Sequence, residues 1–224
     1  MYSSIIFKEW LKTRRIFFTA LVVALLVALY VILTTNSFIK EHGVVSLWLS
    51  MLQKDVSFVE AVTYIPLAIG IALGVAQMVP EVTQKRLKLT LHLPIPQSRL
   101  IALMLAAGLL ELFVIYVLQM GVILAYDATI FHSQMVGRVF LTMLPWYLAG
   151  FVGYLFVTSV CLEGTWYMRI LLSLVGVAVL LVMFLQPSAM ACYNYMLPTV
   201  IIFIAIITIF SFGSIARFKE GHQD

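Results

Sequence analysis

Six long apolar segments constrain the fold of this chain more than any other feature. They lie near residues 16–36, 58–79, 100–126, 138–160, 168–185 and 197–216. About 20 helical residues, at about 1.5 Å of rise each, cross a hydrocarbon core of ~30 Å. The 224 residues are 63% hydrophobic and only 11% charged, more apolar than a soluble fold of this size can bury. We therefore predict an all-α integral membrane protein with six transmembrane helices, residues 1–224 forming one membrane domain.

The Lys and Arg residues of the connectors predict how these helices are oriented. One side of the membrane receives Lys8, Lys12, Arg14, Arg15, Lys85, Arg86, Lys88, Arg99, Arg169, Arg217 and Lys219. The other side receives only Lys40, Lys54 and Arg138. Cytoplasmic loops carry the excess of Lys and Arg, so we expect both termini in the cytoplasm. This bias explains the net charge of +4 better than nucleic-acid binding does. It also separates Cys161 from Cys192, so we expect no disulfide between them.

The N-terminal residues 2–15 have the pattern of an amphipathic helix. The apolar side chains at helical spacing are Ile5, Ile6, Trp10 and Leu11, and the charged side chains opposite them are Lys8, Glu9 and Lys12. Such a helix lies in the membrane interface, with its Trp at the depth of the lipid headgroups. We predict this interfacial helix in preference to the alternative, a cytoplasmic extension of the first span.

The longest basic connector lies between the second and third apolar segments and predicts a cytoplasmic helix over residues 80–94. Pro80 and Glu81 suit a helix start, because Pro fits the first turn and an acid suits the positive end of the helix dipole. Pro94 and Pro96 would end the helix.

Two features of the apolar segments predict local packing. Gly70 and Gly74 have the four-residue spacing that permits close helix approach. The connector at 186–197 carries no charge and is too short to cross the membrane. We expect it to dip into the outer leaflet, held by Tyr193 and Tyr195.

Glu111 is a carboxylate near the middle of the third apolar segment. On a helix, Gly108, Glu111, Gln119 and Tyr126 fall within an arc of about 80°. This stripe must face protein or a water-filled cavity, because the rest of the helix is apolar. An intramembrane carboxylate is a candidate functional residue. The alternative is a protonated Glu that forms an interhelical hydrogen bond for packing.

The sequence lacks the motifs of familiar membrane enzymes and ATPases. The four histidines, His42, His92, His132 and His222, fall in connectors or in the tail. There is no Gly-x-Ser-x-Gly motif and no Gly-Lys pair, and therefore no P-loop. We expect no catalytic residue, no metal site and no cofactor bound by this chain.

Residues 81–99 resemble the first cytoplasmic connector of type-2 ABC exporter permeases. The family carries an acid after the second span, a basic stretch, a Leu-rich helix, a Pro, and an Arg before the third span. The matching residues here are Glu81, Lys85-Arg86, Leu89-Thr90-Leu91, Pro94 and Arg99. The N-terminal Lys8-Glu9-Trp10 and Arg14-Arg15 are similar to the interfacial connecting helix of the family, and the 186–197 connector to its outer re-entrant helices.

The resemblance implies a permease subunit of an ATP-driven exporter in a bacterial cytoplasmic (inner) membrane. It implies two ATPase subunits that bind ATP and Mg, a second permease that is the same or a related chain, and contact with membrane lipids. The residues implied at the ATPase or the headgroups are Glu81, Lys85, Arg86, Lys88, Thr90, His92 and Arg99. The residues implied along the translocation pathway are Glu111, Gln119 and Tyr126.

Two other functions remain open from the sequence. The chain could be a non-catalytic assembly or anchoring subunit of a larger membrane complex. It could also be an intramembrane enzyme for lipid or peptide that uses Glu111, although the missing His and Ser motifs argue against this. The cargo of an exporter cannot be read from the residues.

Overall fold

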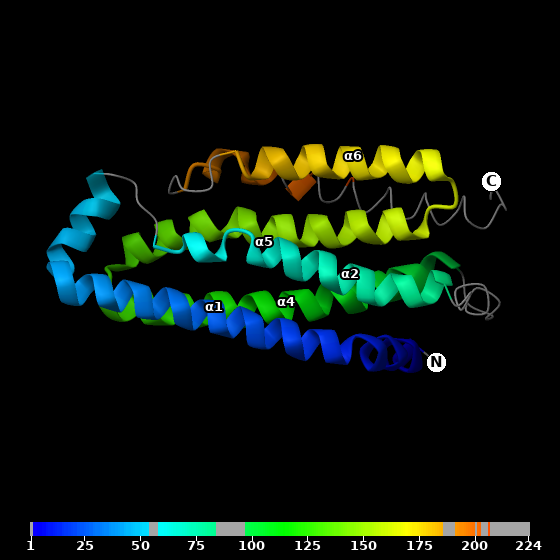
Figure 1. Ribbon diagram of the computed structural model, residues 1–224, viewed down its shortest axis with the longest axis horizontal. Coiled ribbons are helices and arrows are strands. Elements are labelled where there is room, and N and C mark those ends of the chain that lie inside the picture. The colour runs from blue at the N-terminus through cyan, green and yellow to red at the C-terminus, as the bar shows by residue number, and fades with distance from the viewer. Residues whose placement is uncertain are drawn as a thin grey trace.

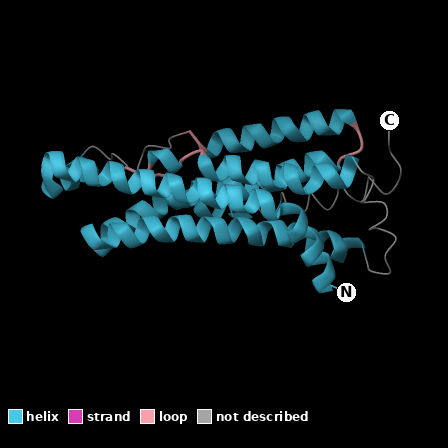
Figure 2. Cartoon of the chain, turned by 60° about the horizontal axis from the view of Figure 1, so that its bottom comes forward, coloured by secondary structure: helices cyan, strands magenta, loops and turns pink. Residues whose placement is uncertain are grey.

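The computed structural model describes residues 2–53, 58–83, 97–185, 191–199, 201–202 and 206, and every regular element among them is helical. The long helices are α1 (Tyr2–Gln53), α2 (Ile65–Thr83), α4 (Gln97–Ile130), α5 (Ser133–Leu162) and α6 (Trp166–Met183). Two short 3₁₀ helices are η1 (Glu60–Val62) and η2 (Asn194–Met196). The long helices lie side by side in an elongated bundle (Figures 1 and 2).

Five helices are long and apolar enough to cross a membrane. They cover Ser4–Met51, Glu60–Thr83, Arg99–Ile130, Ser133–Leu162 and Trp166–Met183. These helices contain or closely overlap the first five predicted spans, so the prediction of an all-helical chain with long apolar helices is confirmed for these five. The sixth predicted span, 197–216, and the cytoplasmic helix at 80–94 lie largely outside the described residues, and both remain predictions.

Successive helices run in opposite directions, so each end of the bundle collects particular termini. The start of α1, the end of α2, the start of α4, the end of α5 and the start of α6 share one end, which we call the N-terminal end (Figure 1). Cys161 lies near this end, and Cys192 lies beyond α6 at the other end. The predicted separation of the two cysteines is therefore confirmed, and neither forms a disulfide within the described chain.

Residues 2–15 are continuous with the first span rather than a separate helix. They belong to α1, whose backbone departs from helical geometry only at Gly43, with φ 79° and ψ 161°. The first turns of α1 run at an angle to the rest of the bundle (Figure 2), and their place in the membrane interface remains a prediction. Gly43 tolerates this φ because it has no Cβ, and α1 changes direction there (Figure 1).

One face of this N-terminal segment is buried. Ile5, Glu9 and Thr13 are buried, whereas Phe7 and Leu11 are exposed. Residues four apart share one face of a helix, and this face packs inward against the bundle. Glu9 therefore has partners inside the protein that the sequence pattern did not reveal.

The tightest helix contact joins α2 to α5. A Cβ atom at Gly70 would overlap the main-chain carbonyl of Gly150, and one at Gly74 would press against Tyr154. The close approach predicted from the Gly70 and Gly74 spacing is therefore confirmed. The hydroxyl of Tyr116 in α4 donates to the Pro66 carbonyl oxygen at 2.7 Å, which ties a third helix to this contact.

The segment after α6 folds back onto the bundle at the end away from the start of α1. Ala191 N donates to Thr142 Oγ1 at 2.9 Å, and the hydroxyl of Tyr193 donates to the Val182 carbonyl oxygen at 3.2 Å. Tyr193 is buried against the bundle, whereas Tyr195 is 95% exposed. The dip of the 186–197 connector into the outer leaflet remains a prediction.

Candidate functional site

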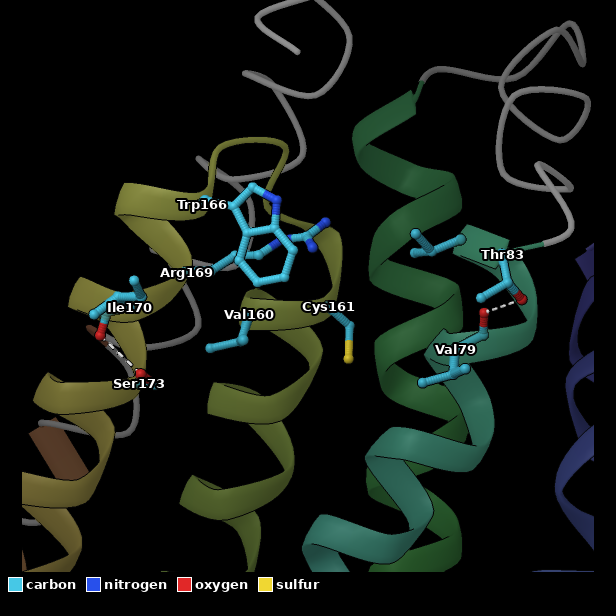
Figure 3. Close-up of a pocket in the computed structure, with 9 residues that line it drawn as sticks. Val79, Thr83, Val160, Cys161, Trp166, Arg169, Ile170 and Ser173 are labelled. Atoms are coloured by element: carbon cyan, nitrogen blue, oxygen red, sulfur yellow. Dashed lines mark hydrogen bonds between the residues drawn. The ribbon is translucent and has the colours of Figure 1, made fainter. Parts of the chain in front are cut away.

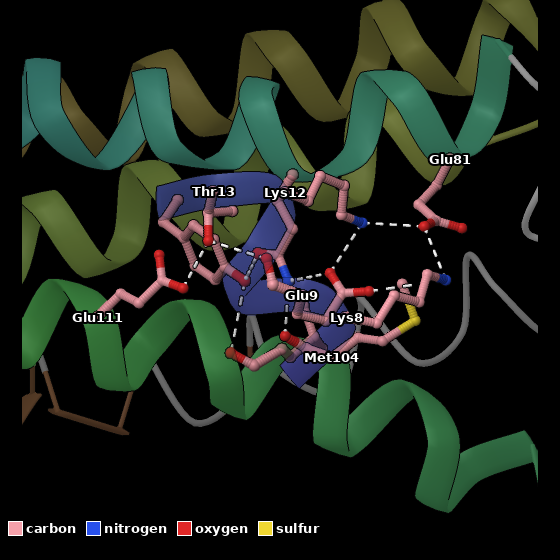
Figure 4. A network of polar contacts seen from close by, with 10 residues as sticks. Lys8, Glu9, Lys12, Thr13, Glu81, Met104 and Glu111 are labelled. Carbon is pink, nitrogen blue, oxygen red and sulfur yellow. Dashed lines mark hydrogen bonds and ion pairs between the residues drawn. The ribbon is translucent and has the colours of Figure 1, made fainter. Parts of the chain in front are cut away.

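A cluster of polar side chains lies inside the bundle near its N-terminal end (Figure 4). We call it the polar cluster, and its members are Lys8, Glu9, Lys12, Thr13, Gln77, Glu81, Glu111 and Tyr154. Four helices contribute to it, namely α1, α2, α4 and α5. Residues spaced by four positions, such as Glu9 with Thr13 and Gln77 with Glu81, place two side chains on the same inward face of each helix.

Ion pairs connect the first turns of α1 to the last turn of α2. Glu81 Oε1 lies 2.9 Å from Lys8 Nζ and 2.9 Å from Lys12 Nζ. Lys12 Nζ also lies 2.8 Å from Glu9 Oε2, so it bridges two carboxylates. The carboxylates of Glu9 and Glu81 are buried, while the Lys8 side chain is 38% exposed. The pairs therefore begin at the surface and continue into the bundle.

Neutral hydrogen bonds extend the polar cluster to α4 and α5. Gln77 Nε2 donates to Glu9 Oε2 at 3.0 Å and to the Met104 carbonyl oxygen at 2.8 Å. The Tyr154 hydroxyl donates to Gln77 Oε1 at 2.7 Å. Gly108 makes room for this contact, because a Cβ atom there would overlap both the Tyr154 hydroxyl and Gln77 Oε1.

Glu111 joins the polar cluster through Thr13. The Thr13 hydroxyl lies 2.6 Å from Glu111 Oε1 and 3.0 Å from the Glu9 carbonyl oxygen, so its single proton can serve only one of them at a time. Glu111 is 5% exposed. This interhelical hydrogen bond is the contact that the packing interpretation of Glu111 predicts, and a role in a translocation pathway remains a prediction.

The three buried carboxylates of the polar cluster have different kinds of partner. Glu9 and Glu81 pair with the ammonium groups of Lys8 and Lys12, whereas the contact of Glu111 is with the Thr13 hydroxyl. Glu81 Oε2 and Glu111 Oε2 have no hydrogen-bond partner within the described chain. Buried charges are stable only when paired and hydrogen-bonded, so the position of α1 depends strongly on that of α2. The described residues contain no group of three or more His, Cys, Asp or Glu suited to a metal ion.

The position of Glu111 along its helix agrees with the sequence-based expectation. The apolar helix Arg99–Ile130 has its midpoint between Val114 and Ile115. Glu111 therefore lies only about 5 Å of helix rise from the middle of that helix.

The other predicted pathway residues lie further along α4. Gln119 Nε2 donates to the Ala24 carbonyl oxygen at 3.1 Å, so this side chain is buried against α1. Tyr126 is only partly buried. The predicted stripe therefore faces protein over Gly108, Glu111 and Gln119, in agreement with the requirement that it avoid lipid.

The predicted coupling residues are only partly described. Glu81 is buried in α2 and paired with α1, and Arg99 is exposed in the first turn of α4. Pro80 lies inside α2, so the helix start predicted at Pro80 is wrong. The remaining predicted coupling residues lie outside the described part of the chain, and these are Lys85, Arg86, Lys88, Thr90 and His92.

Sequence reasoning missed six members of the polar cluster as site residues: Lys8, Glu9, Lys12, Thr13, Gln77 and Tyr154. A signal was available in Gln77, an amide within an apolar segment, followed four residues later by Glu81. Tyr154 had no comparable signal, because a Tyr among apolar residues is also typical of ordinary packing.

No protein-family model, curated protein or solved structure matches this chain.

Proposed function

We propose that this chain is the membrane-spanning permease subunit of an ATP-driven exporter of the type-2 ABC class, working with separate ATPase subunits. Support comes from the five apolar helices and from the basic connector that joins α2 to α4. The order of residues in that connector, from Glu81 to Arg99, resembles the connector by which such permeases contact their ATPases.

One observation carries the proposal: the polar cluster lies where this connector leaves and re-enters the bundle. The connector follows Thr83 at the end of α2 and precedes Gln97 at the start of α4. Glu81, two residues before the connector, pairs with Lys8 and Lys12 of α1. A force applied to the connector therefore acts on α1 through charged contacts of 2.9 Å, and not only through apolar packing.

This arrangement supplies a route from an ATPase to the membrane helices. In the proposed mechanism, ATP binding moves the ATPase subunits and, with them, the connector. The end of α2 then pulls α1 through Glu81, and α1 bears on α4 through Thr13 and Glu111. Two arrangements of these helices, biased by the bound nucleotide, would open and close the pathway at the interface with a second permease.

The test is reconstitution of the full chain with the ATPase that co-purifies with it. We expect the chain to stimulate ATP hydrolysis in proteoliposomes, and the double substitution Lys85→Glu with Arg86→Glu to reduce the stimulation at least tenfold. A charge reversal at the exposed Lys40, at the opposite end of the bundle, is the matched control and should leave hydrolysis unchanged.

The same experiment separates the exporter from an anchoring subunit. An anchoring subunit would co-purify with its partners without changing their rate of ATP hydrolysis. If no ATPase accompanies the chain, and a supplied one is not stimulated, the proposal is wrong.

A further inference from the structure

A groove runs along the outer surface of α5, between α2 and α6, starting at the N-terminal end of the bundle (Figure 3). Its upper part has a volume of about 410 Å³ and lies between Thr83, Trp166 and Arg169. Its lower part has a volume of about 340 Å³ and reaches Leu180. Both parts are lined by Val160, Cys161 and Ser173, so they form one continuous feature.

The polar groups of the groove are concentrated at its upper end. Arg169 Nε donates to the main-chain carbonyl oxygen of Glu163 at 2.8 Å, and its guanidinium lies 5.2 Å from the centre of the Trp166 ring. These contacts orient the side chain. The structure records no hydrogen bond from the two terminal guanidinium nitrogens to any described residue, so they can donate to two oxygens of an anion such as a phosphate.

The lower part of the groove is almost entirely apolar. Its walls include Val75 of α2, Phe156 of α5 and Val177 of α6. Gly153 and Gly176 lie in its lining, where a Cβ atom would crowd Leu67 and Phe156 respectively, so these glycines let the walls of the groove pack closely. In a soluble protein such a surface would be unfavourable, but here it faces the region that the apolar composition assigns to lipid.

The length of the groove matches one leaflet of a bilayer. From Arg169 to Leu180 the α6 axis rises about 16 Å, and half of a hydrocarbon core is about 15 Å. Trp166 and Tyr167, both more than 70% exposed, lie at the upper end, where aromatic residues mark the level of the headgroups. The cation is therefore at headgroup depth, and the apolar channel spans the depth of an acyl chain.

We propose that this groove binds an anionic glycerophospholipid from the leaflet at the N-terminal end, with its phosphate on Arg169 and an acyl chain between α2 and α6. Charge complementarity selects the headgroup, since basic sites between transmembrane helices bind anionic lipids. The match between the groove and one acyl chain selects a lipid rather than a helix of another protein. This inference does not depend on the proposed exporter function.

Native mass spectrometry of the full chain tests the headgroup. Phosphatidylglycerol and phosphatidylcholine with identical acyl chains are added to the detergent-solubilised protein, and the retained lipids are counted. We expect a preference for phosphatidylglycerol that falls about tenfold in Arg169→Gln, as the loss of a charge-assisted hydrogen bond predicts. The control Arg15→Gln removes an exposed cation outside the groove at the same end of the bundle. Equal losses in the two variants, or no preference in the unaltered chain, would overturn the proposal.

Filling the groove tests the acyl-chain site separately. Ser173→Phe places a ring where the two parts of the groove meet, and we expect it to reduce retention of both lipids severalfold. The control is Leu174→Phe, at a neighbouring position that is 66% exposed and outside the groove lining. Unchanged retention in Ser173→Phe would contradict the proposal even if Arg169→Gln fails to fold.

Photo-crosslinking in membranes identifies the occupant directly. A photoreactive amino acid replaces Ile170, which lines the upper groove and is 57% exposed. A phospholipid adduct would support the proposal. A crosslink to residues 203–224 of the same chain, or to a second copy, would show that protein fills the groove and would overturn it.

Discussion

At the scale of single residues, Glu81 shows how a buried partner changes the role of a charge. The resemblance to a permease connector implies that Glu81 faces an ATPase or lipid headgroups. In the structure its carboxylate is buried and contacts Lys8 and Lys12 of α1. Glu81 therefore influences the connector indirectly, because it fixes the end of α2, from which the connector starts, against α1.

The first prediction concerns the stability that this contact provides. Glu81→Gln keeps the side-chain shape but leaves Lys8 and Lys12 without their shared carboxylate. Breaking a buried ion pair costs about 3–5 kcal/mol, and we expect the lower end because the partly exposed Lys8 can turn to water. The free energy of unfolding in detergent micelles measures the effect. Glu41→Gln, at a carboxylate that is 73% exposed, is the control and should change it by less than about 0.5 kcal/mol.

At the scale of elements, α1 continues without a break through residues 2–15 and changes direction at Gly43, where two helical stretches meet. The 41 residues from Tyr2 to His42 correspond to about 62 Å of helix, about twice the hydrocarbon thickness. This stretch is therefore longer than one perpendicular crossing of the membrane requires. Gly43 alone departs from helical geometry, with a backbone conformation that other residues adopt only under strain.

The second prediction concerns this bend. Gly43→Ala keeps open space around its new methyl group but strains the backbone, so we expect a loss of about 1–3 kcal/mol in the free energy of unfolding. Gly121→Ala in α4 is the matched control, because its Cβ also meets no atom within 4 Å and its backbone is helical. That substitution should stabilise the protein by about 0.5–1 kcal/mol. A gain in both variants would show that Gly43 does not need its unusual φ.

At the scale of the whole molecule, the antiparallel order of the helices places Gln53 and Thr83 at opposite ends of the bundle. The described basic residues follow the same division. Arg14, Arg15 and Arg99 belong to the N-terminal end, and Lys40 belongs to the other end. This geometry agrees with the charge asymmetry of the sequence, while the direction of the bundle in the membrane remains a prediction.

The third prediction tests that direction. Lys54→Cys and Lys88→Cys are introduced separately into a chain in which Cys161 and Cys192 are replaced by Ser. A membrane-impermeant maleimide added to intact cells should label position 54 and leave position 88 unlabelled until the cells are opened. Labelling of position 88 from outside would place the connector away from any cytoplasmic ATPase, and the exporter proposal would fail.

The sequence alone determined the helical class, the approximate limits of five spans and the close contact at Gly70. These properties depend on short stretches of sequence. The mean hydropathy of a segment predicts a span, and a glycine, which has no side chain, permits close contact with whichever helix packs against it. Part of the candidate site was also predictable, since Glu81 and Glu111 are carboxylates at or near apolar segments. Their partners were not, because no pattern in the chain says which helix lies opposite.

Only the tertiary structure decided which face of residues 2–15 is buried and which residue contacts Glu111. The amphipathic pattern defines two faces but does not say which of them is buried. The face with Glu9 and Thr13 is buried because α2 and α4 carry its partners, Gln77 and Glu111, and Glu81 of α2 pairs with Lys12. The contact between Thr13 and Glu111 depends on the axial offset between α1 and α4. Rotation and offset are set by contacts between helices, and these contacts exist only once the bundle has formed.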